Sequence, residues 1–330
     1  MAEEKKSIEI IKDPAHVNET AHPFEPVEWW YANALLDAPG SPIDGCALVG
    51  TFTIQRNMAE YCHGMIISSE RGPLADFSGY ELAPGTILSS EEKLHVGCRK
   101  NYLRGGYPRW RLHLEGEDSG RLCRADFEYE ADVAADRRTY NFPPSYLHHY
   151  VVYRSRVRGT IFLGEESWEA KGVGYYEHFY GFLNPVESSG WIWYWCPAAG
   201  SNGVALNLGV STFRDSREPV CFVFFTEDGK TFADFTSASL DVLEKKELGG
   251  IVYPHKIRVT EKSAEGEIEA VITRMDAHYH RVNRSPLATA IFITGFSLLE
   301  GRAAWKGRVY DLRGRAFGSV MRVELPEAST

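Results

Sequence analysis

Wherever the hydrophobic and polar residues of this chain follow a regular pattern, they mostly alternate one by one. In 109–115 and 122–130 every second residue is apolar, and the residues between them are mostly charged. The same alternation occurs in 267–272 and 321–325. Side chains of a β-strand point to opposite faces in turn, so each stretch predicts a strand with one buried and one solvated face. Turn residues such as 227–230 separate the stretches, which favours antiparallel sheets.

One stretch has a pattern typical of a helix. Residues 237–248 (SASLDVLEKKEL) include a serine able to cap a helix, and Gly249-Gly250 would end it. The rest of the chain is mostly β, and its many short strands favour closed or nearly closed barrels, because closure removes exposed strand edges.

An aromatic phrase near the start returns about half a chain later, as EWWY at 28–31 and WIWYW at 191–195. The simplest arrangement is two related barrels divided near 184–185. Chance clustering is the alternative, because aromatic residues make up 13% of the chain. We therefore predict an all-β protein of two antiparallel β-barrel domains packed side by side, over 1–185 and 186–330.

The composition is that of a globular protein, with 44% hydrophobic and 25% charged residues. The net charge of −9 disfavours nucleic acid and anionic membrane surfaces as partners, because both are negatively charged. No apolar run reaches the roughly 20 residues of a spanning helix. The N-terminus lacks the apolar core of a signal peptide, and the six cysteines include no C-x-x-C pair. We expect reduced, mostly buried thiols and a cytoplasmic location.

The stretch 172–181 (GVGYYEHFYG) concentrates the candidate chemistry. Glu177 adjoins His178 among aromatic residues, a setting in which desolvation raises the pKa of a carboxyl group. A carboxyl kept protonated near neutral pH can donate a proton or a hydrogen bond. In an extended strand, Tyr175 and Glu177 would face one side, and Tyr176 and His178 the other. A solvated Glu–His pair at a strand end is the alternative.

Other acid, base or metal candidates carry less information. Glu28, which precedes two tryptophans, could be buried at a barrel mouth. Asp276, His278 and His280 share one strand face, but a polar outward face is favoured over a metal site because no fourth ligand is evident. The neighbours His148-His149 would point to opposite faces. The chain has no nucleophile elbow and no Walker loop, and we expect no metal and no cofactor.

The aromatic content, 8 Trp, 17 Tyr and 17 Phe, suits an apolar pocket with a few polar groups that orient a ligand. The alternative is that these side chains only pack the two barrels. We expect a hydrophobic small molecule as the partner. The candidate binding residues are Trp29, Trp30, Tyr31, Tyr175, Tyr180, Trp191, Trp193 and Trp195.

The chain resembles the AttH/CrtC-like proteins, which are related to lipocalins. Residues 28–31 are similar to the E-W-W-Y opening of that family. A strand bearing tyrosine and arginine (150–156), a short hairpin near 159–161 and the segment 173–181 follow in the family's order. The last segment is similar to the motif G-x-x-(W/Y)-(Y/F)-D-H-x-(W/Y)-G, with Glu177 in the place of the aspartate.

The resemblance implies two lipocalin-like β-barrel domains (the calycin type), with an apolar ligand site in or between them. The family includes carotenoid 1,2-hydratases, kievitone hydratase-like proteins and Diels–Alderase-type cyclases, which act on unsaturated apolar molecules without a redox cofactor. In the hydratases the aspartate of this motif looks like the proton donor, so the resemblance implies that Glu177 has this role here.

Three functions follow as hypotheses. The first is a cofactor-independent cyclase or isomerase of a polyene, polyketide or isoprenoid, in which aromatic residues hold the substrate and Glu177 acts with Tyr176, His178 or Glu28. The second is a hydratase of a carbon–carbon double bond, which needs a second base that the sequence does not identify. The third is a carrier that binds a lipophilic ligand without changing it.

Overall fold

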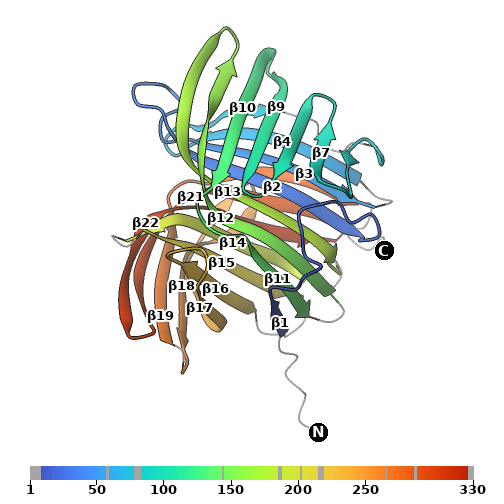
Figure 1. Ribbon diagram of the computed structural model, residues 1–330. Helices are drawn as coiled ribbons and strands as arrows, with labels where there is room; N and C mark the ends of the chain where they lie inside the picture. Colours follow the sequence, from blue (N-terminus) through green and yellow to red (C-terminus); the bar gives the residue numbers. More distant parts are fainter. Residues whose placement is uncertain are drawn as a thin grey trace. The chain divides into compact units, whose positions relative to one another are not determined.

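The computed structural model shows an all-β chain (Figure 1). It describes residues 9–56, 59–77, 83–142, 145–184, 188–200, 203–214, 219–264, 266–285 and 288–325. These residues contain strands and no helix, so none of them forms a helix that could cross a membrane.

Contacts divide the chain into two compact units. The first comprises Met1–Asp44, Leu48–Ile66 and Ala75–Asn184. The second comprises Gly45–Ala47, Ile67–Leu74 and Pro185–Thr330. Two short segments of the N-terminal half therefore group with the C-terminal half.

The first thirteen strands form one antiparallel sheet, in the order β5-β4-β3-β2-β13-β12-β10-β9-β8-β7-β6, with β11 paired to β12 and to β1. Their bounds are β1 Glu9–Lys12, β2 Val27–Asp37, β3 Ala47–Gln55, β4 Ala59–Ser68, β5 Gly72–Phe77, β6 Leu88–Ser89, β7 Leu94–Cys98, β8 Asn101–Gly106, β9 Arg109–Asp118, β10 Arg121–Ala131, β11 Asp136–Phe142, β12 Ser145–Leu163 and β13 Glu166–Phe182.

This sheet curls over itself. Gly50 of β3 and Leu112 of β9 are separated by several strands along the sheet, yet a Cβ placed on Gly50 would lie 3.1 Å from the Leu112 side chain. The alternating stretches behave as predicted: Trp110, Leu112 and Leu114 of β9 are buried, while Arg109 and Arg111 are exposed. Apolar residues of facing strands thus meet inside the curled sheet.

The second sheet closes into a barrel. Its strands run in the order β19-β18-β17-β16-β15-β14-β22-β21-β20, and an additional β19–β21 pairing closes a ring of eight antiparallel strands. Their bounds are β14 Ser188–Ala199, β15 Val204–Phe213, β16 Val220–Thr226, β17 Phe232–Leu248, β18 Ile251–Lys262, β19 Gly266–Arg274, β20 His278–Ser285, β21 Ala288–Trp305 and β22 Arg308–Glu324. The predicted all-β barrel class is confirmed.

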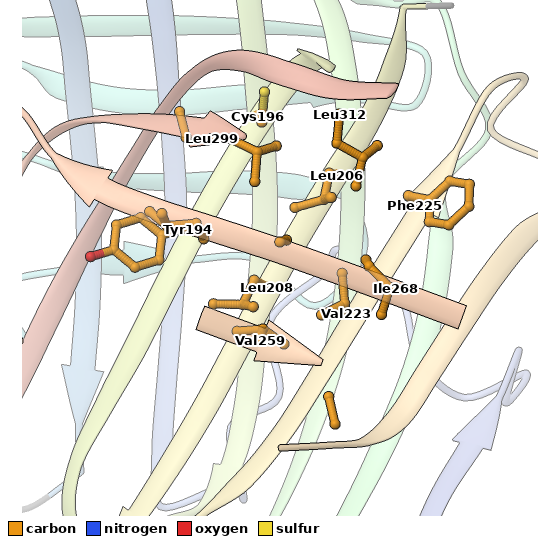
Figure 2. Packing of buried hydrophobic residues seen from close by; sticks show 14 of the residues in the cluster. Tyr194, Cys196, Leu206, Leu208, Val223, Phe225, Val259, Ile268, Leu299 and Leu312 are labelled. Atoms are coloured by element: carbon orange, nitrogen blue, oxygen red, sulfur yellow. The ribbon is translucent and has the colours of Figure 1, made fainter. Parts of the chain in front are cut away.

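The interior of this barrel is filled with apolar side chains, which come from every strand of the ring. Figure 2 shows part of this packing. Tyr194, Leu206 and Phe225 are each about 1% exposed and belong to one continuous cluster. The Phe225 ring lies 5.9 Å from Trp305 and 5.1 Å from Tyr310, in edge-to-face contacts that aromatic pairs prefer.

The helix predicted over 237–248 is wrong, because this segment belongs to strand β17. Leu248 pairs with Ile251 of β18, and the two linking glycines have φ of 59° and 78°. Two consecutive left-handed residues form the type I′ turn of a tight hairpin, so the Gly-Gly pair marks a hairpin and not the end of a helix. Residues 241–247, which include several good helix formers, lie on exposed positions, where strand pairing overrides local propensity.

All six cysteines are buried and unbridged, as predicted.

We expect Phe225→Ala to lower the free energy of unfolding of the second barrel by about 3–5 kcal/mol, because it removes a buried aromatic ring and leaves a cavity. Val242→Ala, at a side chain that is 42% exposed, should change it by less than about 0.5 kcal/mol. Urea denaturation of both variants measures the difference. Equal effects would contradict the assigned core.

Candidate active site

The three segments that carry the family resemblance are hydrogen-bonded neighbours. Strand β13 contains the 173–181 segment, and it pairs with β2 on one side and with β12 on the other. In this register Glu177 is opposite Tyr31, and His178 is opposite Trp30. The motifs therefore form one continuous patch of the first unit, although more than 100 residues separate the first motif from the other two in the chain.

Strand β13 is buried on both faces from Gly174 to Gly181. Tyr175 and Glu177 make their side-chain contacts on one face, and Tyr176, His178 and Tyr180 make theirs on the other. The predicted division of faces is confirmed. Two groups of polar side chains result, and each is described in turn.

On the first face, Glu28 and His178 form a fully buried pair. Nε2 of His178 lies 3.0 Å from Oε1 of Glu28, and both side chains are 0% exposed. Nδ1 of His178 lies 2.9 Å from the backbone carbonyl oxygen of Asn18. The Trp30 ring stacks on the imidazole, with 4.6 Å between centroids and an interplanar angle of 6°.

The surroundings keep Glu28 ionised. Burial alone would raise its pKa, but hydrogen bonds from His178 and His22 outweigh burial and lower the pKa to about 2. Both ring nitrogens of His178 thus lie within hydrogen-bond distance of oxygen atoms. A carboxyl with a pKa near 2 is a poor proton donor at neutral pH, so this geometry disfavours the predicted acid role of Glu28.

Tyr176 and Tyr180 lie on this same first face. The Tyr176 ring stacks on Trp110 at 5.0 Å, and burial raises its pKa well above the ordinary value. The Tyr180 hydroxyl donates to the backbone carbonyl of His16. Both tyrosines are therefore separated from Glu177 by the strand itself.

On the opposite face, the carboxyl group of Glu177 accepts two hydrogen bonds and contacts one imidazole. The Tyr175 hydroxyl donates to Oε2, and the indole N–H of Trp29 donates to Oε1 at 3.4 Å. Nε2 of His149 lies 3.5 Å from Oε2. Glu177 is 7% exposed, whereas Trp29 and Tyr31 on the adjacent strand β2 are partly exposed. Glu177 is thus a buried carboxyl beside two partly exposed aromatic rings.

His149 is a site residue that the sequence analysis considered only as a weak candidate beside His148 and did not connect with Glu177. Its Nδ1 lies 3.2 Å from the Tyr140 hydroxyl, and its ring stacks on Phe179 at 3.7 Å. Burial lowers the pKa of His149, although its contact with Glu177 acts in the opposite direction. The imidazole is therefore neutral near pH 7, which leaves it one nitrogen able to accept a proton.

A second buried ion pair supports this group from β11. Asp136 accepts hydrogen bonds from Nε of Arg138 at 2.6 Å and from the Tyr153 hydroxyl at 2.9 Å. The Tyr153 ring lies 6.5 Å from that of Tyr175. These contacts restrict the side chains that surround Glu177, and a restrained environment is what a positioned acid or base requires.

The structure thus sorts the sequence-predicted residues into three places. Glu177 has Trp29, Tyr31 and Tyr175 around it. The remaining residues of the first unit lie on the opposite face of the sheet: Glu28, Trp30, Tyr176, His178 and Tyr180.

The third place is in the second unit. Trp191, Trp193 and Trp195 lie on β14, alternating with Ile192, Tyr194 and Cys196 of the barrel core. These tryptophans therefore point away from the interior of that barrel. Their role in ligand binding stays a prediction.

The Asp276–His278 pair is present: Nε2 of His278 lies 3.2 Å from Oδ2 of Asp276. Asp276 also accepts from the backbone N–H of Phe296 at 2.5 Å. The side chain of His280 is outside the described residues.

Two solved structures share this fold. An AttH-like protein from Nitrosomonas europaea has a TM-score of 0.67 and 16% identity, over 91% of this chain and 94% of its own. Kievitone hydratase from Nectria haematococca has a TM-score of 0.63 and 13% identity, over 91% of this chain and 89% of its own. CghA, at a TM-score of 0.47, is too distant to bear on fold or function.

No family model and no curated protein matches the sequence. At 16% and 13% sequence identity, the likeness to these two structures establishes the fold alone. The chain has the lipocalin-related fold of the AttH-like structures, so the predicted resemblance is confirmed at the level of the fold.

We expect His149 to make the folded protein less stable as the pH falls from about 7 to 5. The folded-state pKa of His149 lies below its value of 6.5 in the unfolded chain, so the unfolded chain binds more protons in this range. His149→Gln should therefore flatten the fall in unfolding free energy with pH, measured by urea denaturation. An unchanged slope, or NMR evidence for a charged His149 at pH 6.5, would contradict a neutral imidazole.

Proposed function

We propose that this protein is an acid–base enzyme that adds water to a carbon–carbon double bond of an apolar small molecule. The observation that carries the proposal is the contact between Glu177 and His149. A hydratase needs an acid for the alkene and a base for the water, and these two side chains supply one of each on a single face.

The arrangement supports a complete proton cycle. The protonated carboxyl of Glu177 transfers a proton to one alkene carbon. Nε2 of neutral His149 removes a proton from the water whose oxygen bonds to the neighbouring carbon. His149 then returns that proton to Glu177 across their 3.5 Å contact, so water is added and both side chains regain their starting states.

The neighbouring groups have positioning roles. With Nδ1–H of His149 directed to the Tyr140 oxygen, Nε2 is the nitrogen left to act as a base. Phe179 stacks on both His149 and Trp29, with centroids 3.7 and 4.8 Å away. These contacts hold the imidazole and the indole in place without adding charge.

The likeness of the fold to that of kievitone hydratase supports the proposal only by analogy. A fold alone does not determine which reaction a protein catalyses. The substrate class is inferred from the residues about Glu177. Trp29 and Tyr31, which are partly exposed, offer aromatic surface suited to an unsaturated polyketide, polyene or isoprenoid.

A cyclase or isomerase is the second candidate, and the same aromatic surface favours it. These rings could hold a flexible polyene close to its reactive conformation, while Glu177 polarises a carbonyl or protonates an alkene. This reaction takes up no water and leaves His149 without a role as a base. A carrier function would require neither group.

We expect Glu177→Gln to abolish product formation, with at least about a hundredfold loss of turnover, because the amide cannot donate the proton. The measurement compares lipophilic extracts of cells carrying wild-type or variant protein by mass spectrometry. Glu169→Gln, an exposed position on the same strand, is the matched control and should behave as wild type. Unaltered product with Glu177→Gln would support a carrier.

The compound that accumulates with Glu177→Gln should be lighter than the lost product by one water. In wild-type cells grown in ¹⁸O-labelled water, the product should then carry the label, because the added oxygen comes from solvent. His149→Gln should lower product formation as well. A precursor of the same mass as the product, with no label incorporated, would instead establish cyclisation or isomerisation.

A further inference from the structure

A second constellation of ligand-type side chains lies on the face of β13 opposite to Glu177. Oε1 of Glu28 lies 3.0 Å from Nε2 of His178 and 3.4 Å from Nδ1 of His22. All three atoms fall within 4.8 Å of one another, and among the described residues this is the one group of three such ligands. The residues come from β2, from β13 and from the segment before β2.

The other polar atoms of two of these side chains are already held by outer partners. Nδ1 of His178 is 2.9 Å from the Asn18 carbonyl oxygen, and Oε2 of Glu28 is 3.3 Å from Nη2 of Arg56. Outer contacts of this kind orient the ligands of protein metal sites. They leave Nε2 of His178 and Oε1 of Glu28 directed at each other and at His22.

His22 supplies an unsatisfied nitrogen. Its Nδ1 is buried and lies 3.4 Å from Oε1 of Glu28 without the geometry of a hydrogen bond, while its backbone N–H donates to that oxygen at 2.8 Å. The ring is held flat against Tyr180, with 3.5 Å between centroids. A nitrogen lone pair fixed beside a buried carboxylate is a ready metal ligand.

We propose that His22, Glu28 and His178 form a binding site for a zinc ion. Zinc bonds of about 2.0–2.2 Å in tetrahedral geometry place neighbouring ligand atoms roughly 3.3 Å apart, close to the two distances from Oε1. Two imidazoles and one carboxylate leave the fourth position to solvent. His22 is 20% exposed while its partners are 0% exposed, so the ion enters from the His22 side.

Electrostatics are compatible with this assignment. Glu28 would supply the anionic ligand of the site through Oε1, while Arg56 contacts its other oxygen, Oε2. Zinc would bind the lone pair of Nε2 of His178, so this nitrogen carries no proton when the ion is bound. This site is independent of the proposed reaction, because β13 separates it from Glu177.

The test is zinc binding by the purified, chelator-treated full-length chain. After dialysis against zinc, elemental analysis should find one ion per chain, and calorimetry should give the same stoichiometry. His22→Ala removes one ligand and leaves the Glu28–His178 pair, so the fold should persist by circular dichroism. Its zinc affinity should fall by about tenfold or more.

His95→Ala, at an exposed histidine outside the group, is the matched control and should bind as wild type does. His278→Ala tests the Asp276–His278 pair as a competing site. The proposal is overturned if the wild-type chain retains no stoichiometric zinc. It also fails if His22→Ala binds as tightly as wild type, or if His278→Ala is the variant that loses the ion.

Discussion

The pairing of β13 with both β2 and β12 is the constraint on which the candidate site depends. Backbone hydrogen bonds on both edges fix the register, and a strand's period of two then separates Glu177 from His178. Because both faces are buried, each ionisable side chain must find partners within its own face. His178 meets Glu28, and Glu177 meets Tyr175 and His149.

The two resulting groups differ in chemical character. Glu28 accepts a hydrogen bond from His22 and lies beside His178, and these contacts lower its pKa although the side chain is buried. Glu177 has a phenol, an indole and a neutral imidazole beside it, with no guanidinium among these contacts. The two carboxyl groups of this strand pair therefore differ in the chemical groups that contact them, although both are buried.

Much of this arrangement could be predicted from the sequence, because alternation is a local property. The pattern of 109–115 and 122–130 predicts strands and their faces, and the order of the motif segments predicts the fold. The hairpin at Gly249 was missed because the exposed residues of 241–248 are good helix formers, and their pairing with β18 is decided by contacts outside the segment.

His149 illustrates the same limit at the candidate site. Its face on β12 follows from alternation with His148, but no local feature distinguishes which of the two meets Glu177. The decision rests on the β12–β13 register, in which His149 is opposite Phe179 and Val151 is opposite Glu177. Glu28 and Glu177 are both glutamates flanked by aromatic residues in the sequence. Only their contacts in the fold distinguish them: Glu28 meets His178, and Glu177 meets Tyr175 and His149.

The segment before β2 shows how a chain without regular secondary structure can be fixed in place. Glu19 accepts from the backbone N–H of Tyr107 at 2.7 Å and from the indole of Trp110 at 2.9 Å, while its carbonyl accepts from Trp30. An apolar segment could cover the same surface in several registers. Directional contacts to donors at fixed positions favour one register, because a shift would break these hydrogen bonds, each worth about 1 kcal/mol. The contacts of Glu19, together with the backbone N–H of His22 that donates to Glu28, hold His22 beside Glu28.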